Sequence, residues 1–497
     1  MTKILADIHA AVWGVPTLVL ILGVGLYLSL RTRACQIRLL PAAVKQVFSK
    51  REHTQAGTVS PFRALCTALA ATVGTGNLAG VAGAMALGGP GAIFWMWISG
   101  LLGMVTKFAE ATLAVRYRVR RESGEYVGGP MYMIRQGMGK RFHFLAGLYS
   151  FFGIIAAFGV GNATQINALL GGIRTAASAF EVSVDTNTEL LITAGLAVLI
   201  GVLLLGGAKR IGAAAEKLVP FASAAYVLLC MGVLLSCRRA VPSAFAAILR
   251  GAFDPRAVTG GMVGSAFCTL RLGISRGVFT NEAGMGTASI AHASAQVDHP
   301  VKQGMMGILE VFLDTIVICT MTALVILCSG TQIRYGVDEG AVLTGRAFSQ
   351  VYGGWVTVPL ALFLTLFALA TVLGWGLYGA RCAEFLFGSR AWKSFVFLQM
   401  ITVIAGGVLK TGTVWLIADI VNGLMAIPNL IALAALSPEL LRLIKSFPGG
   451  NAATGGTYEN FHQCKPLRTF SHEKVPSLRR GSRASGKDHL SSEHRSA

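Results

Sequence analysis

Long runs of uncharged apolar residues constrain this chain more than any other feature. They alternate with short polar connectors, and most charged residues lie in the connectors. A helix needs about 20 apolar residues to cross the roughly 30 Å hydrocarbon core of a bilayer. Because no water is present there to bind backbone N–H and C=O groups, each run must be helical. The sequence therefore predicts an all-α protein that crosses a lipid bilayer many times.

We expect eleven membrane-spanning helices. They lie at residues 12–30, 62–88, 91–115, 142–170, 190–206, 214–236, 257–275, 301–328, 355–380, 393–409 and 413–436. Only 13% of the 497 residues are charged, which is about half the fraction found in typical soluble proteins.

The distribution of Lys and Arg predicts the orientation of these spans. The connectors after the first and third spans are rich in Lys and Arg, whereas residues 171–189 carry one Arg and three acidic residues. Basic connectors remain on the cytoplasmic side, so the N-terminus is expected outside and the C-terminus in the cytoplasm. The four arginines of residues 237–256 oppose this assignment, but the two richest connectors outweigh them. The expected location is the plasma membrane, which is the inner membrane of a two-membrane bacterium.

Other classes of protein fit the sequence poorly. The net charge of +20 is spread over connectors and tail rather than over one face, so no nucleic-acid partner is expected. The nine cysteines have no CxxC spacing, which argues against a disulfide framework or a metal site. Without HExxH, GxSxG or paired histidines, neither an enzyme nor a cofactor is expected. A channel would need a continuous polar lining, and the sequence predicts no oligomeric state.

Two regions interrupt the apolar pattern with glycine. In the first, Gly74 and Gly76 flank Thr75 just before Asn77, in the middle of the second span. In the second, residues 271–287 combine four glycines with many polar side chains. Each has a simpler explanation, namely close helix packing through a GxxxG spacing for the first and an ordinary loop for the second.

The positions of the two interruptions favour a transporter. With the first span set aside, ten spans form two sets of five, and each set begins with an interrupted helix of opposite orientation. Such paired interruptions indicate a binding site at the membrane midplane. The expected parts of the chain are an N-terminal span with its connector, a first repeat, an outer connector, a second repeat and a disordered cytoplasmic tail. They are residues 1–61, 62–236, 237–256, 257–436 and 437–497.

Interrupted helices suit a zwitterionic amino acid. The N-terminus of a half-helix offers N–H donors to a carboxylate, and freed carbonyl groups can face an ammonium group or a sodium ion. These partners do not require many buried formal charges, which are expensive in a membrane.

The sequence resembles the alanine or glycine:cation symporter family of the amino acid–polyamine–cation superfamily. The resemblance covers nearly the whole chain except the tail, and its motifs are long. They are the run from Ser60 to Tyr117, GGPMYMI (128–134), GVGNATQINAL (159–169), GISRGVFTNEAGMGTASIAHASA (273–295) and ADIVNGLMAIPNLIAL (418–433). The resemblance implies a leucine-transporter-type fold, with two inverted five-helix repeats behind one extra helix. It also implies symport of alanine, including D-alanine, or glycine, commonly with sodium.

The resemblance also implies individual site residues. The expected substrate-binding residues are Thr75, Gly76, Asn77, Gln165, Asn167, Gly273, Thr371 and Trp375. The expected sodium-binding residues are Ala70, Val73, Phe367 and Thr371. N–H groups near Thr75 and Gly76 would receive the substrate carboxylate, and Gly273 would let carbonyls approach its ammonium group. Trp375 lies too deep for an interfacial aromatic belt, so it is expected to limit the size of the substrate.

One departure from the family pattern concerns the ion. The family usually has a Ser-Thr pair in the ninth span, whereas this chain has Ala370-Thr371. One hydroxyl oxygen is therefore missing from the expected sodium site, and proton coupling becomes the alternative. Asp314 is then a candidate proton carrier, although a structural role is equally compatible with the sequence.

Several other polar residues within spans have structural interpretations. Lys107 and Glu110 are spaced to pair with each other, and Asp419 is expected to hold helices together. Glu282 is expected near the inner surface as a helix cap or latch, with a gate as the alternative.

Overall fold

The computed structural model describes residues 2–48, 57–178, 180–261, 263, 265–408 and 412–448. Almost all of this part is helical, and the one small sheet pairs β1 (Val119–Arg120) with β2 (Tyr126–Val127) in antiparallel register. Most of the predicted tail lies outside the described residues, but its first ten residues form helix α23 (Ser437–Ser446).

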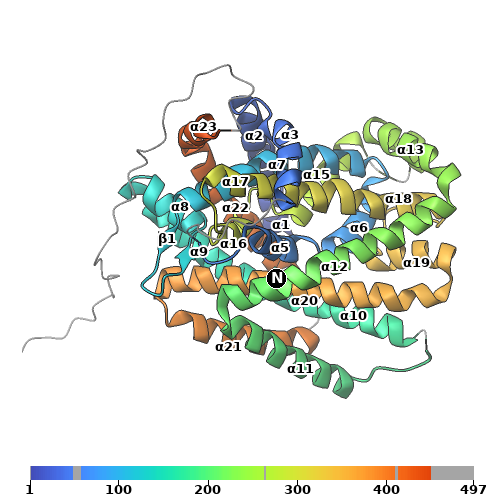
Figure 1. Ribbon diagram of the computed structural model, residues 1–497. Helices are drawn as coiled ribbons and strands as arrows, with labels where there is room; N and C mark the ends of the chain where they lie inside the picture. Colours follow the sequence, from blue (N-terminus) through green and yellow to red (C-terminus); the bar gives the residue numbers. More distant parts are fainter. Residues whose placement is uncertain are drawn as a thin grey trace, which may run out of the picture. The chain divides into compact units, whose positions relative to one another are not determined.

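The helices follow one another along the chain with short connections (Figure 1). The first half contains α1 (Thr2–Val12), α2 (Val15–Arg31), α3 (Cys35–Arg38), α4 (Leu40–Val47), α5 (Pro61–Thr72), α6 (Val81–Gly88), α7 (Ala92–Arg116), α8 (Pro130–Gly137), α9 (His143–Phe158), α10 (Thr164–Ser178), α11 (Thr186–Leu205) and α12 (Gly207–Ser236). The second half contains α13 (Val241–Phe253), α14 (Pro255–Thr259), α15 (Ala266–Asn281), α16 (Thr287–His292), α17 (Pro300–Val311), α18 (Thr320–Cys328), α19 (Ala341–Tyr352), α20 (Thr357–Phe387), α21 (Ala391–Val408), α22 (Gly412–Ala435) and α23. Three π-helical segments, η1 (Gly76–Gly80), η3 (Gly159–Ala163) and η5 (Phe312–Cys319), lie within longer helices.

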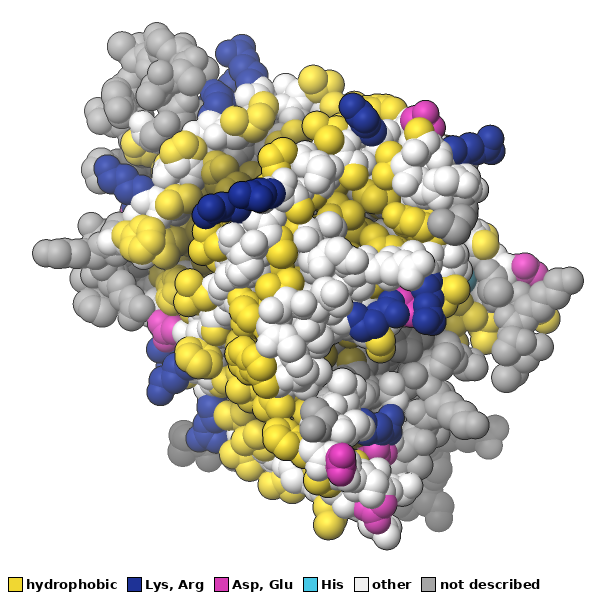
Figure 2. Space-filling model, turned by 90° about the vertical axis from the view of Figure 1, so that its right-hand side faces the viewer, with side chains coloured by type: hydrophobic (Ala, Val, Ile, Leu, Met, Phe, Trp, Pro, Cys, Tyr) yellow, Lys and Arg dark blue, Asp and Glu magenta, His cyan; other side chains and the backbone are white. Residues whose placement is uncertain are grey.

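The helices agree with a membrane protein. Among the described residues, seven helices are long and apolar enough to cross a membrane, or up to nine if each sharply bent pair is one span. Large apolar side chains are exposed on α11 and α12, among them Leu191, Leu228 and Leu235, as contact with lipid requires. Figure 2 shows apolar side chains over much of one face. The count of eleven spans stays a prediction.

The seventh predicted span is misplaced along the sequence. Its expected range was 257–275, whereas α14 ends at Thr259 and α15 begins only at Ala266. Gly260 and Gly261, with φ of 63° and 84°, adopt the left-handed conformation that ends a helix. The apolar run therefore belongs to two helices.

The first glycine-rich region breaks its helix as predicted. Helix α5 ends at Thr72, and Val73 is extended, with φ −77° and ψ 104°. The chain becomes helical again at η1, and the two halves are bent by 50°. The ends of both half-helices thus lie inside the protein.

The second break lies within the predicted region 271–287, at its C-terminal end, and does not include Gly273. Helix α15 continues through Gly273 and ends at Asn281. Glu282, Gly284 and Gly286 then have φ of 53°, 94° and 78°, before α16 begins. A Cβ at Gly273 would lie 2.3 Å from the carbonyl oxygen of Ala92, so this glycine permits close packing of α15 on α7 rather than a break.

The packing of the other helices places the two breaks together. Helix α7 packs along α15 and α17, while α20 packs along α9, α10 and α12. The segments η1, α15 and η5 contact one another, and α5 and α16 both contact α20. The breaks therefore lie between the α7–α17 pair and α20.

Candidate substrate and ion site

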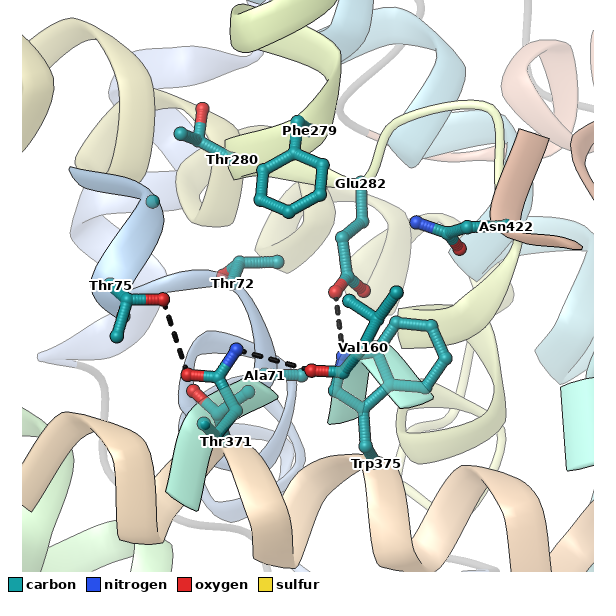
Figure 3. Close-up of a pocket in the computed structure, with 13 residues that line it drawn as sticks. Ala71, Thr72, Thr75, Val160, Phe279, Thr280, Glu282, Thr371, Trp375 and Asn422 are labelled. Atoms are coloured by element: carbon teal, nitrogen blue, oxygen red, sulfur yellow. Dashed lines mark hydrogen bonds between the residues drawn. The ribbon is translucent and has the colours of Figure 1, made fainter. Parts of the chain in front are cut away.

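A pocket lies where the two breaks meet (Figure 3). Its walls come from both sides of the first break, from η3 and α10, from the end of α15 and from α20 and α22. The lining residues are Ala71, Thr72, Gly74, Thr75, Gly76, Val160, Gln165, Phe279, Thr280, Glu282, Thr371, Trp375 and Asn422.

The first break supplies hydrogen-bond donors to the pocket. Thr75 and Gly76 begin the second half-helix, and the first N–H groups of a helix have no partner within it. The Thr75 hydroxyl donates to Gln165 Oε1 at 3.2 Å, and Gln165 Nε2 donates to the Val160 carbonyl at 3.2 Å (Figure 3). This side of the pocket is therefore polar and carries no charged side chain among its described residues.

Close approach explains the glycines of the first break. A Cβ at Gly76 would lie 3.0 Å from Thr280 Cγ2, and a Cβ at Gly74 would lie 2.9 Å from Thr371 Oγ1. A side chain at either position would push the backbone away from α15 or α20. The glycines thus let bare backbone form part of the wall.

The second break supplies a carboxylate. Glu282 is buried, lines the pocket and accepts hydrogen bonds from Trp375 Nε1 at 2.9 Å and from the Thr287 hydroxyl at 2.5 Å. Figure 3 shows its carboxyl group directed toward Trp375. The sequence did not predict this role, since Glu282 was expected near the inner surface. The signal that could have predicted this role is the TNEAG run (280–284) within the glycine-rich region. An acidic side chain where a helix ends can point into a site between helices.

A second carboxylate, that of Glu110, binds the backbone of this break through hydrogen bonds. Glu110 Oε1 accepts hydrogen bonds from the N–H groups of Gly284 at 2.9 Å and Gly286 at 3.1 Å. Asn429 Nδ2 donates to the same oxygen at 2.8 Å and to the Gly284 carbonyl at 2.8 Å. The left-handed backbone after Glu282 is therefore held by side chains of α7 and α22.

The predicted pair of Lys107 and Glu110 is wrong. Lys107 Nζ lies 3.3 Å from Glu310 Oε1, whose other oxygen is 2.9 Å from His292 Nε2. Gln303 Nε2 in turn contacts His292 Nδ1 at 2.7 Å. Lys107 of α7 thus pairs with Glu310 of α17. Glu110 instead binds the backbone of the second break.

The structure brings five of the eight expected substrate residues to the pocket. They are Thr75, Gly76, Gln165, Thr371 and Trp375. Asn77, Asn167 and Gly273 are not among the lining residues. The Asn77 side chain points instead to Asp314 Oδ1, 2.7 Å away, and Asn167 is half-buried further along α10.

The expected sodium residues lie at the junction of α5 and α20. Val73 caps the C-terminus of α5, and the last carbonyl groups of a helix lack partners within it. The Thr371 hydroxyl donates to the Phe367 carbonyl at 2.9 Å and lies on the pocket wall. Ala70 and Ala370 are both fully buried, and Ala370 offers no hydroxyl to an ion.

Comparison with known proteins agrees with this arrangement. The family described as the sodium:alanine symporter family matches residues 1–460. The chain belongs to this family. Its members are transporters, so the chain is a multi-pass membrane protein of amino acid and cation symport.

Several relatives match over nearly their whole length. The chain is 44% identical to an uncharacterized transporter of Haemophilus influenzae, covering 90% of this chain and 96% of the relative. It is 42% identical to the sodium/alanine symporter AgcS of Methanococcus maripaludis, covering 88% and 96%. It is also 38% identical to the probable sodium/glutamine symporter GlnT of Bacillus subtilis, covering 88% of each.

Solved transporters share the fold. The crystal structure of MhsT in complex with L-phenylalanine matches with a TM-score of 0.51 at 13% identity, covering 80% of this chain and 99% of that chain. Mhp1, a nucleobase-cation-symport-1 family transporter, matches with a TM-score of 0.51 at 13% identity, covering 79% and 94%. The fold is thus of the leucine-transporter type.

Proposed function

We propose that this protein takes up alanine or glycine together with sodium, by alternating access, across the plasma membrane. One observation carries the proposal: a single pocket joins the N–H donors of one broken helix to a buried carboxylate at the other. A free α-amino acid needs partners of both kinds within a few ångströms of each other. The relative named a sodium/alanine symporter supports the choice of solutes.

The substrate has a definite expected orientation. Its carboxylate lies at the N–H groups of Thr75 and Gly76, beside the Gln165 amide, because a half-helix N-terminus attracts anions. Its ammonium group faces the Glu282 carboxylate. This assignment gives Glu282 the role that the sequence had suggested for carbonyls near Gly273.

The walls favour a small side chain. Trp375 is fixed by its hydrogen bond to Glu282, and a Cβ at Gly161 would lie 2.2 Å from Trp375 Cβ. The indole therefore has little room to withdraw, which favours alanine or glycine over larger substrates. Because one relative is named for glutamine, glutamine belongs among the competitors to be tested.

The proposed topology has eleven spans, an outer N-terminus and a cytoplasmic C-terminus. One extra N-terminal helix precedes two inverted repeats of five helices, within residues 62–236 and 257–436. The support is that a broken helix occurs early in each of these ranges, at residues 73–75 and 282–286. In alternating access, these broken helices move relative to their neighbours to open one side at a time.

The proposed sodium site combines the carbonyl groups at the end of α5, at Ala70 and Val73, with Phe367 and Thr371 of α20. Proton coupling is the second candidate, favoured by the missing hydroxyl at Ala370 and by the buried carboxyl of Asp314.

Uptake of labelled alanine into sealed proteoliposomes tests both candidates, with sodium and pH gradients imposed separately. Sodium-driven accumulation is the expected result. Accumulation that ignores sodium but requires a proton gradient would establish the alternative. Absence of saturable uptake under every gradient would contradict transport of alanine.

A further inference from the structure

The centre of the protein contains more acidic than basic side chains. Among the described side chains, eight charged or histidine residues are buried, and two of them, Arg381 and Glu384, pair at 2.8 Å. The other six are Lys107, Glu110, Glu282, His292, Glu310 and Asp314. Four carboxyl groups therefore face one ammonium group and one imidazole. Buried ionised carboxylates are costly unless they are paired or hydrogen-bonded.

Two of the four carboxyl groups have fixed partners and lie beside the Lys107 ammonium group on α7 and α17. Glu310 contacts Lys107 and His292 with separate oxygens, at 3.3 Å and 2.9 Å. Glu110 accepts three N–H donors on one oxygen and lies one helical turn from Lys107 on α7. A third, Glu282, faces the pocket, where the substrate's ammonium group is expected.

Asp314 is the carboxyl group that remains. It is completely buried and does not line the pocket. Its partners are neutral: Asn77 Nδ2 donates to Oδ1 at 2.7 Å, and the Thr315 hydroxyl donates to Oδ2 at 2.9 Å. No cationic side chain contacts it in the described part of the chain. A proton on the carboxyl would remove a buried charge that has hydrogen-bond donors but no cationic partner.

The local hydrogen bonds can accommodate that proton. Thr315 has a hydroxyl group, which can accept as well as donate, and Asn281 Nδ2 already donates to it at 3.1 Å. With a proton on Oδ2, Asp314 donates to Thr315 Oγ1, and the Thr315 hydroxyl turns toward a carbonyl of the preceding helical turn. Asn77 continues to donate to Oδ1. The two protonation states thus differ by the reversal of the Asp314–Thr315 hydrogen bond and a rotation of the Thr315 hydroxyl.

We propose that Asp314 is a protonation site that connects the two helix breaks. Asn77, which donates to Asp314, accepts the N–H of Gly74 on its Oδ1 at 2.8 Å in the first break. Asn281, which donates to Thr315, accepts the N–H of Ala283 on its Oδ1 at 3.0 Å in the second. A change in the protonation of Asp314 therefore affects the backbone of the first break through the Asn77 side chain. It affects the backbone of the second break through Thr315 and the Asn281 side chain. Asp314 also lies on the π-helical segment η5, a local geometry common at functional sites.

Other ionisable groups around Asp314 have their own partners or lie at the surface. From α17 and α7 come Glu310, Lys107 and Glu110, which are accounted for above. On η5 itself, the Cys319 thiol accepts from Asn77 Nδ2 at 3.3 Å. The arginines of α15, Arg271 and Arg276, are exposed or half-exposed, and η1 and α18 carry no charged side chain.

The effect on transport rests on the proposed function, whereas proton binding at Asp314 does not, so two measurements separate them. The first is infrared difference spectroscopy of the full-length purified protein between about pH 5 and about pH 9. We expect the carbonyl stretch of a protonated carboxyl group, lost in Asp314→Asn and retained with a shift in Asp314→Glu. Asp298→Asn, at an exposed carboxylate paired with Lys302, is the matched control.

The second measurement is alanine exchange between sealed proteoliposomes and medium at equal sodium on both sides and equal pH on both sides. We expect the wild-type and Asp314→Glu rates to change about tenfold over that pH range, while the Asp314→Asn rate stays constant. An infrared band unchanged in Asp314→Asn, or parallel pH profiles for Asp314→Asn and wild type, would overturn the proposal. If the wild type exchanges no alanine at any pH, the proposed function fails, and the infrared result alone decides the protonation of Asp314.

Discussion

The two helix breaks are built by opposite means. In the first, small residues leave backbone N–H groups uncovered at the pocket, and no charged side chain stands in the break. In the second, Glu282 stands in a left-handed conformation, and the backbone after it is held by Glu110 and Asn429. One break thus offers donors, and the other offers a carboxylate.

This difference makes the two walls of the pocket chemically distinct. An amino acid has one anionic and one cationic end, so a site with donors on one wall and a carboxylate on the other fixes its orientation. In the proposed binding mode, the first break attracts the anion with backbone dipoles, which avoids a buried cationic side chain. The second break needs an acidic side chain, and a buried carboxylate needs fixed partners in turn.

The largest expected effect comes from the charge at the second break. Glu282→Gln removes the proposed partner of the substrate's ammonium group while keeping the shape of the side chain. Alanine uptake should fall about 100-fold, since truncating a buried charge pair costs several kcal/mol. Initial uptake rates in proteoliposomes measure this. Glu122→Gln, at an exposed position of the β1–β2 turn, is the control, and near-normal uptake by Glu282→Gln would contradict the assignment.

The next effect tests the close approach at the first break. Gly76→Ala places a Cβ 3.0 Å from Thr280 Cγ2, whereas Gly80→Ala places one at 3.9 Å from the same atom. We expect Gly76→Ala to lower alanine affinity about tenfold because the wall must shift. Gly80→Ala should bind normally. Equal affinities of the two variants in a binding assay would argue against a backbone wall.

A smaller effect concerns the support of the second break. Asn429→Ala removes the donor to the Gly284 carbonyl and one of the three donors to Glu110 Oε1. We expect a loss of about 1–3 kcal/mol of stability, visible as a lower Tm of the detergent-solubilised protein. Asn187→Ala, at an exposed position of α11, should leave the Tm unchanged. An unchanged Tm in Asn429→Ala would mean that the break holds without this amide.

The smallest effect is expected at Trp375. Trp375→Phe keeps an aromatic wall but removes the N–H that binds Glu282. Uptake should show a KM for alanine raised about threefold, with kcat little changed, because Glu282 loses one hydrogen-bond donor but keeps the Thr287 hydroxyl. Competition by larger amino acids such as glutamine should increase. A large fall in kcat would instead place Trp375 in the conformational change.

The sequence predicted the helical membrane architecture and the first break because both follow from local composition. Charge-free runs require helices in lipid, and Gly74 and Gly76 weaken a helix wherever they occur. The seventh span was misplaced, since the apolar run gave no sign that Gly260 and Gly261 would end α14. The second break lies within the predicted residues 271–287, but its position inside them was not predicted. Gly273 was expected to belong to the break, but it lies within α15 and packs against Ala92. The sequence alone does not distinguish a glycine that breaks a helix from one that permits close packing.

The candidate site was predicted in part for a similar reason. Thr75 and Gln165 follow from motif and resemblance, but the partners of Lys107 and Glu110 depend on α17 and the second break. Sequence spacing favoured a pair within α7, whereas packing brings Glu310 closer to Lys107. Glu282 was misjudged because its depth depends on where α15 ends.

The most direct test of opposed walls is equilibrium binding of alanine and of propionate, which lacks the ammonium group, to the wild type and to Glu282→Gln. We expect the wild type to bind alanine much more tightly than propionate. Glu282→Gln should bind alanine more weakly and so lose most of this preference. Its affinity for propionate should not fall. If the substitution weakens both ligands equally, or neither, the carboxylate of the second break does not receive the ammonium group.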